Sequence, residues 1–103
     1  MSQRMLAGQP VDVNDEGYFI DPSQWTDAMA TELAHEAGID LTPTHLKVVH
    51  FLRDRHASGK PLTIRRVGKS GIVTIKEFYA LFPGGPLKVS SKIAGIPKPT
   101  SCV

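Results

Sequence analysis

The sequence predicts a mainly α, α+β fold: a small helical bundle with an N-terminal β-hairpin, a helix-turn-helix-like element and a flexible C-terminal arm. Three observations predict it. Apolar residues recur at helical spacing after Pro-containing helix starts, a turn sequence separates two strand-like runs near the N-terminus, and closely spaced prolines precede the C-terminus. With 103 residues and 41% apolar content, the chain fits one domain over residues 1–103 with a modest core.

The hairpin is expected over residues 11–20. Val11-Asp12-Val13 and Tyr18-Phe19-Ile20 are short strand-like runs, and they flank the turn sequence Asn14-Asp15-Glu16-Gly17. A turn ending in Gly between two such runs is a hairpin signal.

The first helix is expected roughly over residues 23–37. Asp21-Pro22-Ser23 supplies N-cap candidates and a proline suited to a first helical turn. Trp25, Met29 and Leu33 then recur every four residues, which indicates one apolar helix face.

The second helix is expected from Pro43 to about residue 56 or 57, because Thr42-Pro43 repeats the same start chemistry. Leu46, Val49 and Leu52 form its apolar stripe. This face is broad enough for a central helix.

Three shorter helices follow. Thr63 is a candidate cap for a helix over residues 64–67, and Thr74-Ile75-Lys76-Glu77 is a capping box that starts a helix reaching Phe82. A last amphipathic helix runs from Leu87 to near Gly95.

Charge divides the chain into two unequal parts. Residues 1–40 contain one Arg against eight Asp and Glu, whereas residues 41–103 contain eleven Lys and Arg against two. A basic half can attract phosphate or an acidic protein surface, and charge alone does not choose between them.

Composition also excludes several classes of protein. The single cysteine excludes an intramolecular disulfide and the structural zinc sites that need two or more thiolates. No apolar run approaches the roughly 18 residues of a membrane span, and Met1 to Pro10 lacks the apolar stretch of a signal peptide. We therefore expect a soluble, cytoplasmic protein with no membrane partner.

The most distinctive residue is Cys102, one position from the C-terminus. Pro97 and Pro99 each fix φ and lack a backbone N–H, so residues 95–103 are expected to form an extended arm. An arm can carry a thiol into a pocket on another protein, and the thiolate is the nucleophile. The alternative is an incidental cysteine on a terminal tail.

Other residues of this region are assigned roles in docking. Gly95 is the candidate hinge, and Pro97 and Pro99 stiffen the arm so that less entropy is lost on insertion. Lys92 and Lys98 are expected to meet an acidic or phosphate-lined channel.

No metal or cofactor is expected. The four histidines, His35, His45, His50 and His56, are separated by 10, 5 and 6 positions, which does not build a set of ligands on one helix face. The sequence also lacks G-x-S-x-G, H-E-x-x-H and Walker-type motifs.

The helices expected at 63–67 and 74–82 form a helix-turn-helix-like pair. Arg65, Arg66 and Lys69 are its candidates for contact with nucleic acid. The pair lacks a cluster of Asn, Gln or Ser that would read base edges, which favours protein docking or a structural role over direct nucleic-acid binding.

The chain resembles a known family over most of its length, and a C-terminal block is the most specific part of the resemblance. The block Leu81-Phe82-Pro83-Gly84-Gly85-Pro86, followed by Lys92-Ile93-Ala94-Gly95-Ile96-Pro97-Lys98-Pro99-Thr100 and Cys102, is similar to the signature of the DsrC/TusE sulfur-carrier family. The resemblance implies that Cys102 corresponds to the family's penultimate cysteine, which receives sulfur as a persulfide. It implies a carrier, a sulfurtransferase-type protein without turnover of its own.

One departure from the family pattern narrows this expectation. Members that work with dissimilatory sulfite reductase carry a second cysteine eleven positions earlier, where this chain has Ser91. The resemblance therefore favours the single-cysteine branch, in which a heteromeric sulfurtransferase donates sulfur and a tRNA thiouridylase accepts it for 2-thiouridine synthesis. The alternatives are a carrier or partner in dissimilatory sulfur metabolism, a DNA-binding redox regulator and a non-catalytic assembly subunit.

Overall fold

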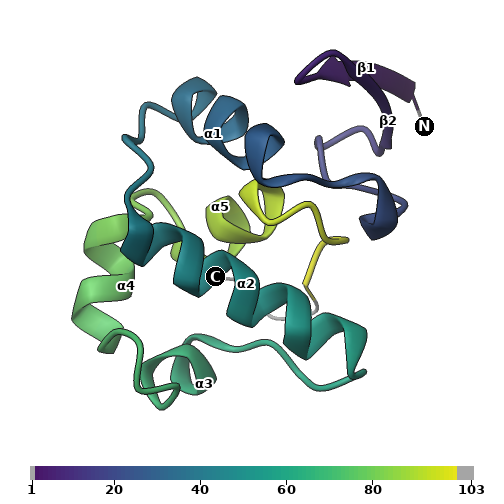
Figure 1. Ribbon diagram of the computed structural model, residues 1–103. Helices are drawn as coiled ribbons and strands as arrows, with labels where there is room; N and C mark the ends of the chain where they lie inside the picture. The colour runs from purple at the N-terminus through teal and green to yellow at the C-terminus, as the bar shows by residue number, and fades with distance from the viewer. Residues whose placement is uncertain (1, 100–103) are drawn as a thin grey trace.

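A computed structural model describes residues 2–99, which form a helical bundle with one small sheet (Figure 1). The elements in chain order are β1 (Ser2–Leu6), β2 (Gln9–Val13), a 3-10 turn η1 (Pro22–Gln24), α1 (Asp27–Glu36), α2 (Pro43–Ala57), α3 (Ile64–Gly68), α4 (Ile75–Leu81) and α5 (Pro86–Ile93). This architecture confirms the predicted fold class.

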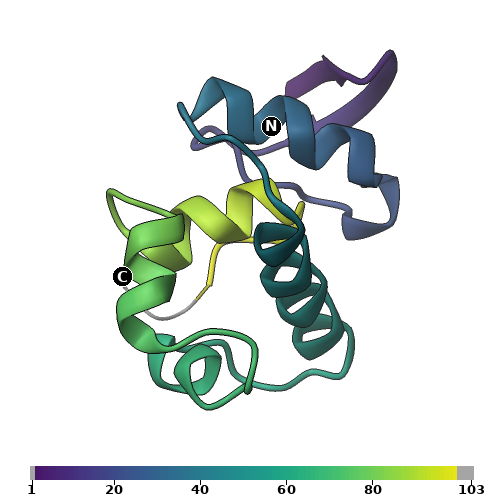
Figure 2. The same ribbon diagram turned by 60° about the vertical axis from the view of Figure 1, so that its left-hand side comes forward.

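Helix α5 occupies the middle of the bundle. Figures 1 and 2 both show it between α1 on one side and α2 and α4 on the other, and it contacts all three. Leu87 and Ile93 of α5 are buried, together with Met29 of α1, Val48 of α2 and Phe82 after α4. The C-terminal segment therefore leaves from the core of the molecule.

The regular hairpin lies before the predicted one, and the predicted pairing of residues 11–13 with 18–20 is present only in part. Strand β1 pairs antiparallel with β2, with Leu6 opposite Gln9, so the turn is Ala7-Gly8. Both turn residues have positive φ, +49° and +76°, which matches the right-handed twist of two-residue hairpins.

The segment predicted as the hairpin turn is a loop beside the sheet. The Asn14 side chain accepts hydrogen bonds from the Glu16 and Tyr18 amides, each at 3.0 Å. A bridge between Val13 and Phe19 continues the pairing here, with backbone bonds from the Asn14 amide to the Tyr18 carbonyl at 2.9 Å and from the Ile20 amide to the Asp12 carbonyl at 3.0 Å. The local turn chemistry is therefore real, but it closes an Asx-type loop and not a second pair of strands.

The first helix starts later than predicted. Asp21 caps the 3-10 turn through a 3.0 Å bond from the Ser23 amide, and the chain is then extended at Trp25 and Thr26. Helix α1 begins only at Asp27. Trp25 is therefore not part of the α1 face, contrary to the prediction.

The other helix starts confirm the predicted caps. Thr63 accepts a hydrogen bond from the Arg66 amide, and Thr74 and Glu77 form the predicted capping box. Thr42 also caps α2, and there the reciprocal partner is the buried His45 side chain.

Residues 95 and 96 pack into the body of the protein. Gly95 is buried, Ile96 is 1% exposed, and the Ile96 amide donates to the Ser91 carbonyl at 3.3 Å. Burial decreases from Pro97 onward, and Lys98 is exposed. The arm predicted over residues 95–103 is thus anchored over its first two residues, while its flexibility stays a prediction.

Candidate functional site

The candidate site is the root of the arm, residues 91–99, because the predicted sulfur carrier Cys102 lies outside the described residues. The structure brings the predicted docking residues Lys92, Gly95, Pro97, Lys98 and Pro99 to this root. It does not bring Arg65, Arg66 and Lys69 there, since they belong to α3 and its C-cap.

Trp25 is the first residue that holds the root. Its indole N–H donates to the Ile93 carbonyl at 2.8 Å. Gly95 has φ of +65°, and the indole lies so close that a Cβ at this position would be 2.6 Å from Trp25 Cγ. A glycine is therefore required here both for its backbone conformation and for space.

Arg53 of α2 is the second residue that holds the root. Its guanidinium donates to the Ala94 carbonyl at 2.9 Å, to the Gly95 carbonyl at 3.5 Å and to the Pro22 carbonyl at 2.9 Å. It also lies 4.3 Å from the centre of the Trp25 ring, in cation–π geometry.

Burial lowers the pKa of the Arg53 guanidinium, while the nearby carboxylates of Asp27 and Asp54 oppose this effect. The group stays protonated at neutral pH, because an arginine starts from a very high pKa. The carbonyl groups at the end of α5 are thus satisfied by a positive charge, which the helix dipole also favours.

Two lysines link the root to the loop after β2. Lys98 Nζ lies 3.0 Å from a carboxylate oxygen of Glu16, and both side chains are about half-exposed. Lys92 Nζ lies 5.2 Å from the centre of the Tyr18 ring. Burial raises the pKa of Tyr18, Glu16 raises it further, and Lys98 acts in the opposite direction.

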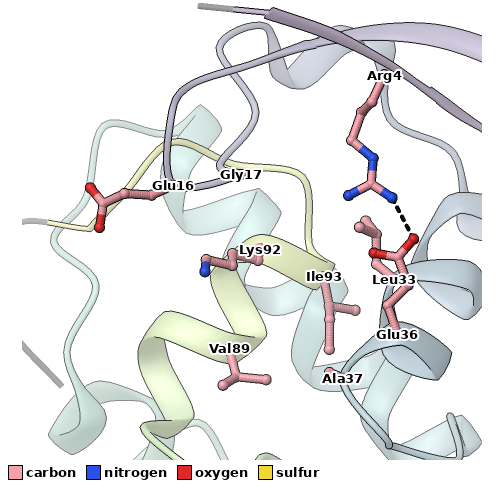
Figure 3. A pocket seen from close by; sticks show the side chains of 9 residues that line it. All are labelled: Arg4, Glu16, Gly17, Leu33, Glu36, Ala37, Val89, Lys92 and Ile93. Atoms are coloured by element: carbon pink, nitrogen blue, oxygen red, sulfur yellow. Dashed lines mark hydrogen bonds and ion pairs between the residues drawn. The ribbon is translucent and has the colours of Figure 1, made fainter.

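A cavity of about 290 Å³ lies beside Lys92 (Figure 3). It is lined by Arg4, Glu16, Gly17, Leu33, Glu36, Ala37, Val89, Lys92 and Ile93. Arg4 and Glu36 form an ion pair at its edge. The cavity lining thus contains charged groups of both signs.

A second cavity of about 200 Å³ follows the arm itself. His56, Lys60, Pro61 and Leu62 line it from the end of α2, and Pro97, Lys98 and Pro99 line it from the arm. The described part of the arm therefore runs past a surface that contains His56 and Lys60.

Ser91 lies within the root and is fully buried. Its Oγ is the one buried side-chain polar atom among residues 2–99 that has no hydrogen-bond partner. Its neighbour Ser90, equally buried, donates to the Leu87 carbonyl at 3.2 Å.

Two of the four histidines, His45 and His50, have structural partners. His45 Nδ1 accepts from the Thr42 amide at 3.1 Å, and its Nε2 lies 2.9 Å from the Leu81 carbonyl oxygen, so Nε2 carries the proton. His50 Nε2 lies 2.8 Å from Asp27 Oδ1. Within residues 2–99 no group of three or more His, Cys, Asp or Glu side chains is arranged to hold a metal.

Sequence reasoning missed Trp25, Arg53 and Glu16 as parts of the site. Trp25 fits the helical period, and Arg53 reads as an ordinary charge on an exposed helix face. Their contacts reach across 68 and 41 positions, respectively, so no local signal could reveal them.

None of the helices within residues 2–99 is long and apolar enough to cross a membrane.

Comparison with known proteins places this geometry in a family. The family model described as "DsrC like protein" matches residues 5–103. The sulfurtransferase TusE of Escherichia coli K12 is 36% identical over 107 residues, covering 96% of this chain and 98% of the relative. The gamma subunit of the dissimilatory-type sulfite reductase of Nitratidesulfovibrio vulgaris is 33% identical over the full length of both chains.

A solved structure agrees with the fold. The NMR structure of DsrC from Allochromatium vinosum matches with a TM-score of 0.80 and 31% identity, covering 98% of this chain and 97% of that chain. The sequence resemblance and the arrangement of the helices therefore have the same explanation: the chain belongs to the DsrC-like family.

Proposed function

We propose that this protein is a carrier in a sulfur relay, with Cys102 holding the sulfane sulfur as a persulfide. The observation that carries the proposal is a DsrC-like chain whose single cysteine stands at the penultimate position. The name of the E. coli relative, sulfurtransferase, agrees with it.

The chemistry requires two exchanges of one sulfur atom. The Cys102 thiolate attacks the outer sulfur of a donor persulfide, a new S–S bond forms, and the donor leaves as a thiolate. An acceptor thiolate then attacks the outer sulfur on Cys102 and releases Cys102 as a thiolate. Neither step needs an external oxidant or reductant, since one S–S bond breaks as another forms.

The residues of the root support delivery of this thiol. Pro97 and Pro99 restrict the backbone, and so reduce the entropy lost when the arm enters a partner. Lys92 and Lys98 place positive charge at the start of the arm, which suits an acidic or phosphate-lined channel. Gly95 was the predicted hinge, but its close packing against Trp25 favours a flexible point later in the arm.

For the place of the carrier in metabolism, tRNA thiolation is the leading proposal. The position of the family's second cysteine is Ser91, which cannot form a disulfide with Cys102. A single-thiol relay fits this arrangement, with a heteromeric sulfurtransferase as donor and a tRNA thiouridylase as acceptor. Transfer in dissimilatory sulfur metabolism is the alternative, and the sulfite reductase subunit from N. vulgaris is the relative that favours it.

The test is the intact mass of the reduced protein after incubation with a persulfide-generating sulfurtransferase. Wild type should gain one or more sulfur atoms, and reductant should remove them. Cys102→Ser should gain none while keeping the same circular dichroism spectrum. Sulfur bound equally by Cys102→Ser would contradict the proposal, because the chain has no other thiol.

A further inference from the structure

The strongest unassigned feature of the molecule is the pair formed by Trp25 and Arg53. Together they bind the carbonyl groups of Ile93, Ala94 and Gly95, which are consecutive residues at the end of α5. Both side chains come from segments far from this end of α5 in the sequence.

The pair is itself rigidly held. The guanidinium of Arg53 lies over the Trp25 ring and also donates to the Pro22 carbonyl. The same carbonyl accepts the Trp25 amide and so ends the 3-10 turn. An arginine fork that binds carbonyls from two segments fixes their relative position, because its donors lie in one plane. The root of the arm is thus tied to both α2 and the N-terminal half.

Three further contacts limit movement at Gly95 and Ile96. The indole lies against Gly95, the Ile96 side chain is buried, and the Ile96 amide bonds the Ser91 carbonyl. Rotation of the backbone at Gly95 would break all of them. Beyond Ile96, the described residues are more exposed, and the ion pair of Lys98 is at the surface.

We infer that Trp25 and Arg53 form a clamp that fixes the origin of the arm, so that the arm pivots after Ile96 and not at Gly95. The thiol of Cys102 is then six residues from the pivot, a reach of at most about 20 Å. Arg53 and Trp25 are positioning residues, because they act on the thiol only through the backbone of the root.

The clamp matters for sulfur transfer because a fixed origin reduces the volume that the thiol explores. A preorganised arm loses less entropy on entering a partner than one that is free from α5 onward. This consequence rests on the proposed sulfur-carrier function, but the clamp itself does not. It is therefore tested by backbone dynamics, without any sulfur donor.

The first experiment measures amide order parameters by NMR on the wild-type protein. Gly95 and Ile96 should have values near 0.85, like the helices, and the decrease should begin at Lys98. Values below about 0.6 already at Gly95 would overturn the inference. This measurement needs no variant, so it does not depend on whether a variant folds.

The second experiment removes the clamp. Arg53→Met keeps an unbranched stem but loses the three carbonyl contacts, and the order parameters of Ala94, Gly95 and Ile96 should fall below about 0.6. Arg55→Met is the matched control, because Arg55 lies on the same helix but binds the Pro61 carbonyl and not the carbonyls of Ala94 and Gly95. It should leave the root rigid.

Trp25→Phe provides a second variant that retains an aromatic ring and loses the N–H donated to Ile93. It should loosen the root less than Arg53→Met does. If both variants fold and both keep a wild-type root, the clamp does not exist.

The third experiment uses the single thiol as a label. A nitroxide on Cys102 should broaden a limited set of body amides in wild type and in Arg55→Met, and a wider set in Arg53→Met. If Arg53→Met lowers the order parameters of the root but broadens the same amides as wild type, the role of Arg53 in positioning the thiol is wrong. Failure of Cys102 to load sulfur would instead overturn the proposed function and leave these results standing.

Discussion

Gly95 and Trp25 are packed so closely that the backbone of the arm root leaves no room for a side chain. A Cβ at position 95 would be 2.6 Å from Trp25 Cγ and 2.8 Å from Trp25 Cβ. Glycine is also required by the positive φ of +65°. These two constraints have separate energetic costs, which one pair of variants can distinguish.

Gly95→Ala should lower the free energy of unfolding more than Gly59→Ala. Gly59 has nearly the same φ, +68°, but lies in open space, so its substitution costs only the backbone term of about 1–2 kcal/mol. Overpacking against Trp25 adds about 1–3 kcal/mol at position 95. Urea unfolding measures both variants, and equal losses would show that Trp25 moves aside without cost.

The buried hydroxyl of Ser91 gives a second prediction. Because its Oγ is unpartnered among the described residues, Ser91→Ala removes an unsatisfied polar atom and should leave stability unchanged or raise it by about 1 kcal/mol. Ser90→Ala, which removes the bond to Leu87, should lower it by about 1 kcal/mol. A clear loss of stability in Ser91→Ala would reveal a hydrogen bond to that hydroxyl in solution.

The caps of α3 and α4 could be predicted from sequence because the interaction is local. Thr63 and Thr74 each accept a bond from an amide three residues later, and that spacing is visible in the chain. The end of the helical region before residue 97 could be predicted for the same reason, since Pro97 and Pro99 act on their own backbone.

Trp25 and the hairpin show where such reasoning stops. The spacing of Trp25 fits a helix, but its indole binds Ile93, and tertiary packing overrides the pattern. Residues 14–17 are a more typical turn sequence than Ala7-Gly8, yet the regular strands are joined by Ala7-Gly8. In this pairing Leu6 and Val11 are fully buried. Burial of side chains selected the pairing, and the sequence of the turn did not.

The phenol of Tyr18 predicts a dependence of stability on alkaline pH. Burial, aided by Glu16, raises its pKa above that of an unfolded tyrosine, about 10. A raised pKa in the folded state means that the stabilising contribution is complete below pH 10 and is lost as the pH rises through the folded value. Stability should therefore decline at high pH through this group.

The measurement is a spectrophotometric titration at alkaline pH in Tyr79→Phe, which leaves Tyr18 as the only tyrosine. Its inflection should lie above that of a free tyrosine. Adding Glu16→Gln should move the inflection to lower pH, because it removes one of the two causes that raise the pKa. An inflection at or below the free value would mean that water reaches the phenol.

The last prediction separates binding from stability at Lys98. Its ion pair with Glu16 is half-exposed, and such pairs contribute about 0–1 kcal/mol. Lys98→Ala should therefore change the free energy of unfolding by less than about 1 kcal/mol. If Lys98 instead serves to meet an acidic channel, the same variant should slow sulfur loading from a protein donor several-fold, with a weaker dependence on salt than wild type.

Lys88→Ala is the matched control, because Lys88 is an exposed lysine on α5 that lies before the root. It should load sulfur at the wild-type rate. Loading from a small persulfide should be the same in all three proteins, since no channel is entered and the thiol itself is unchanged. An equal slowing by both alanine variants would mean that overall charge, and not the position of Lys98 on the arm, guides the encounter.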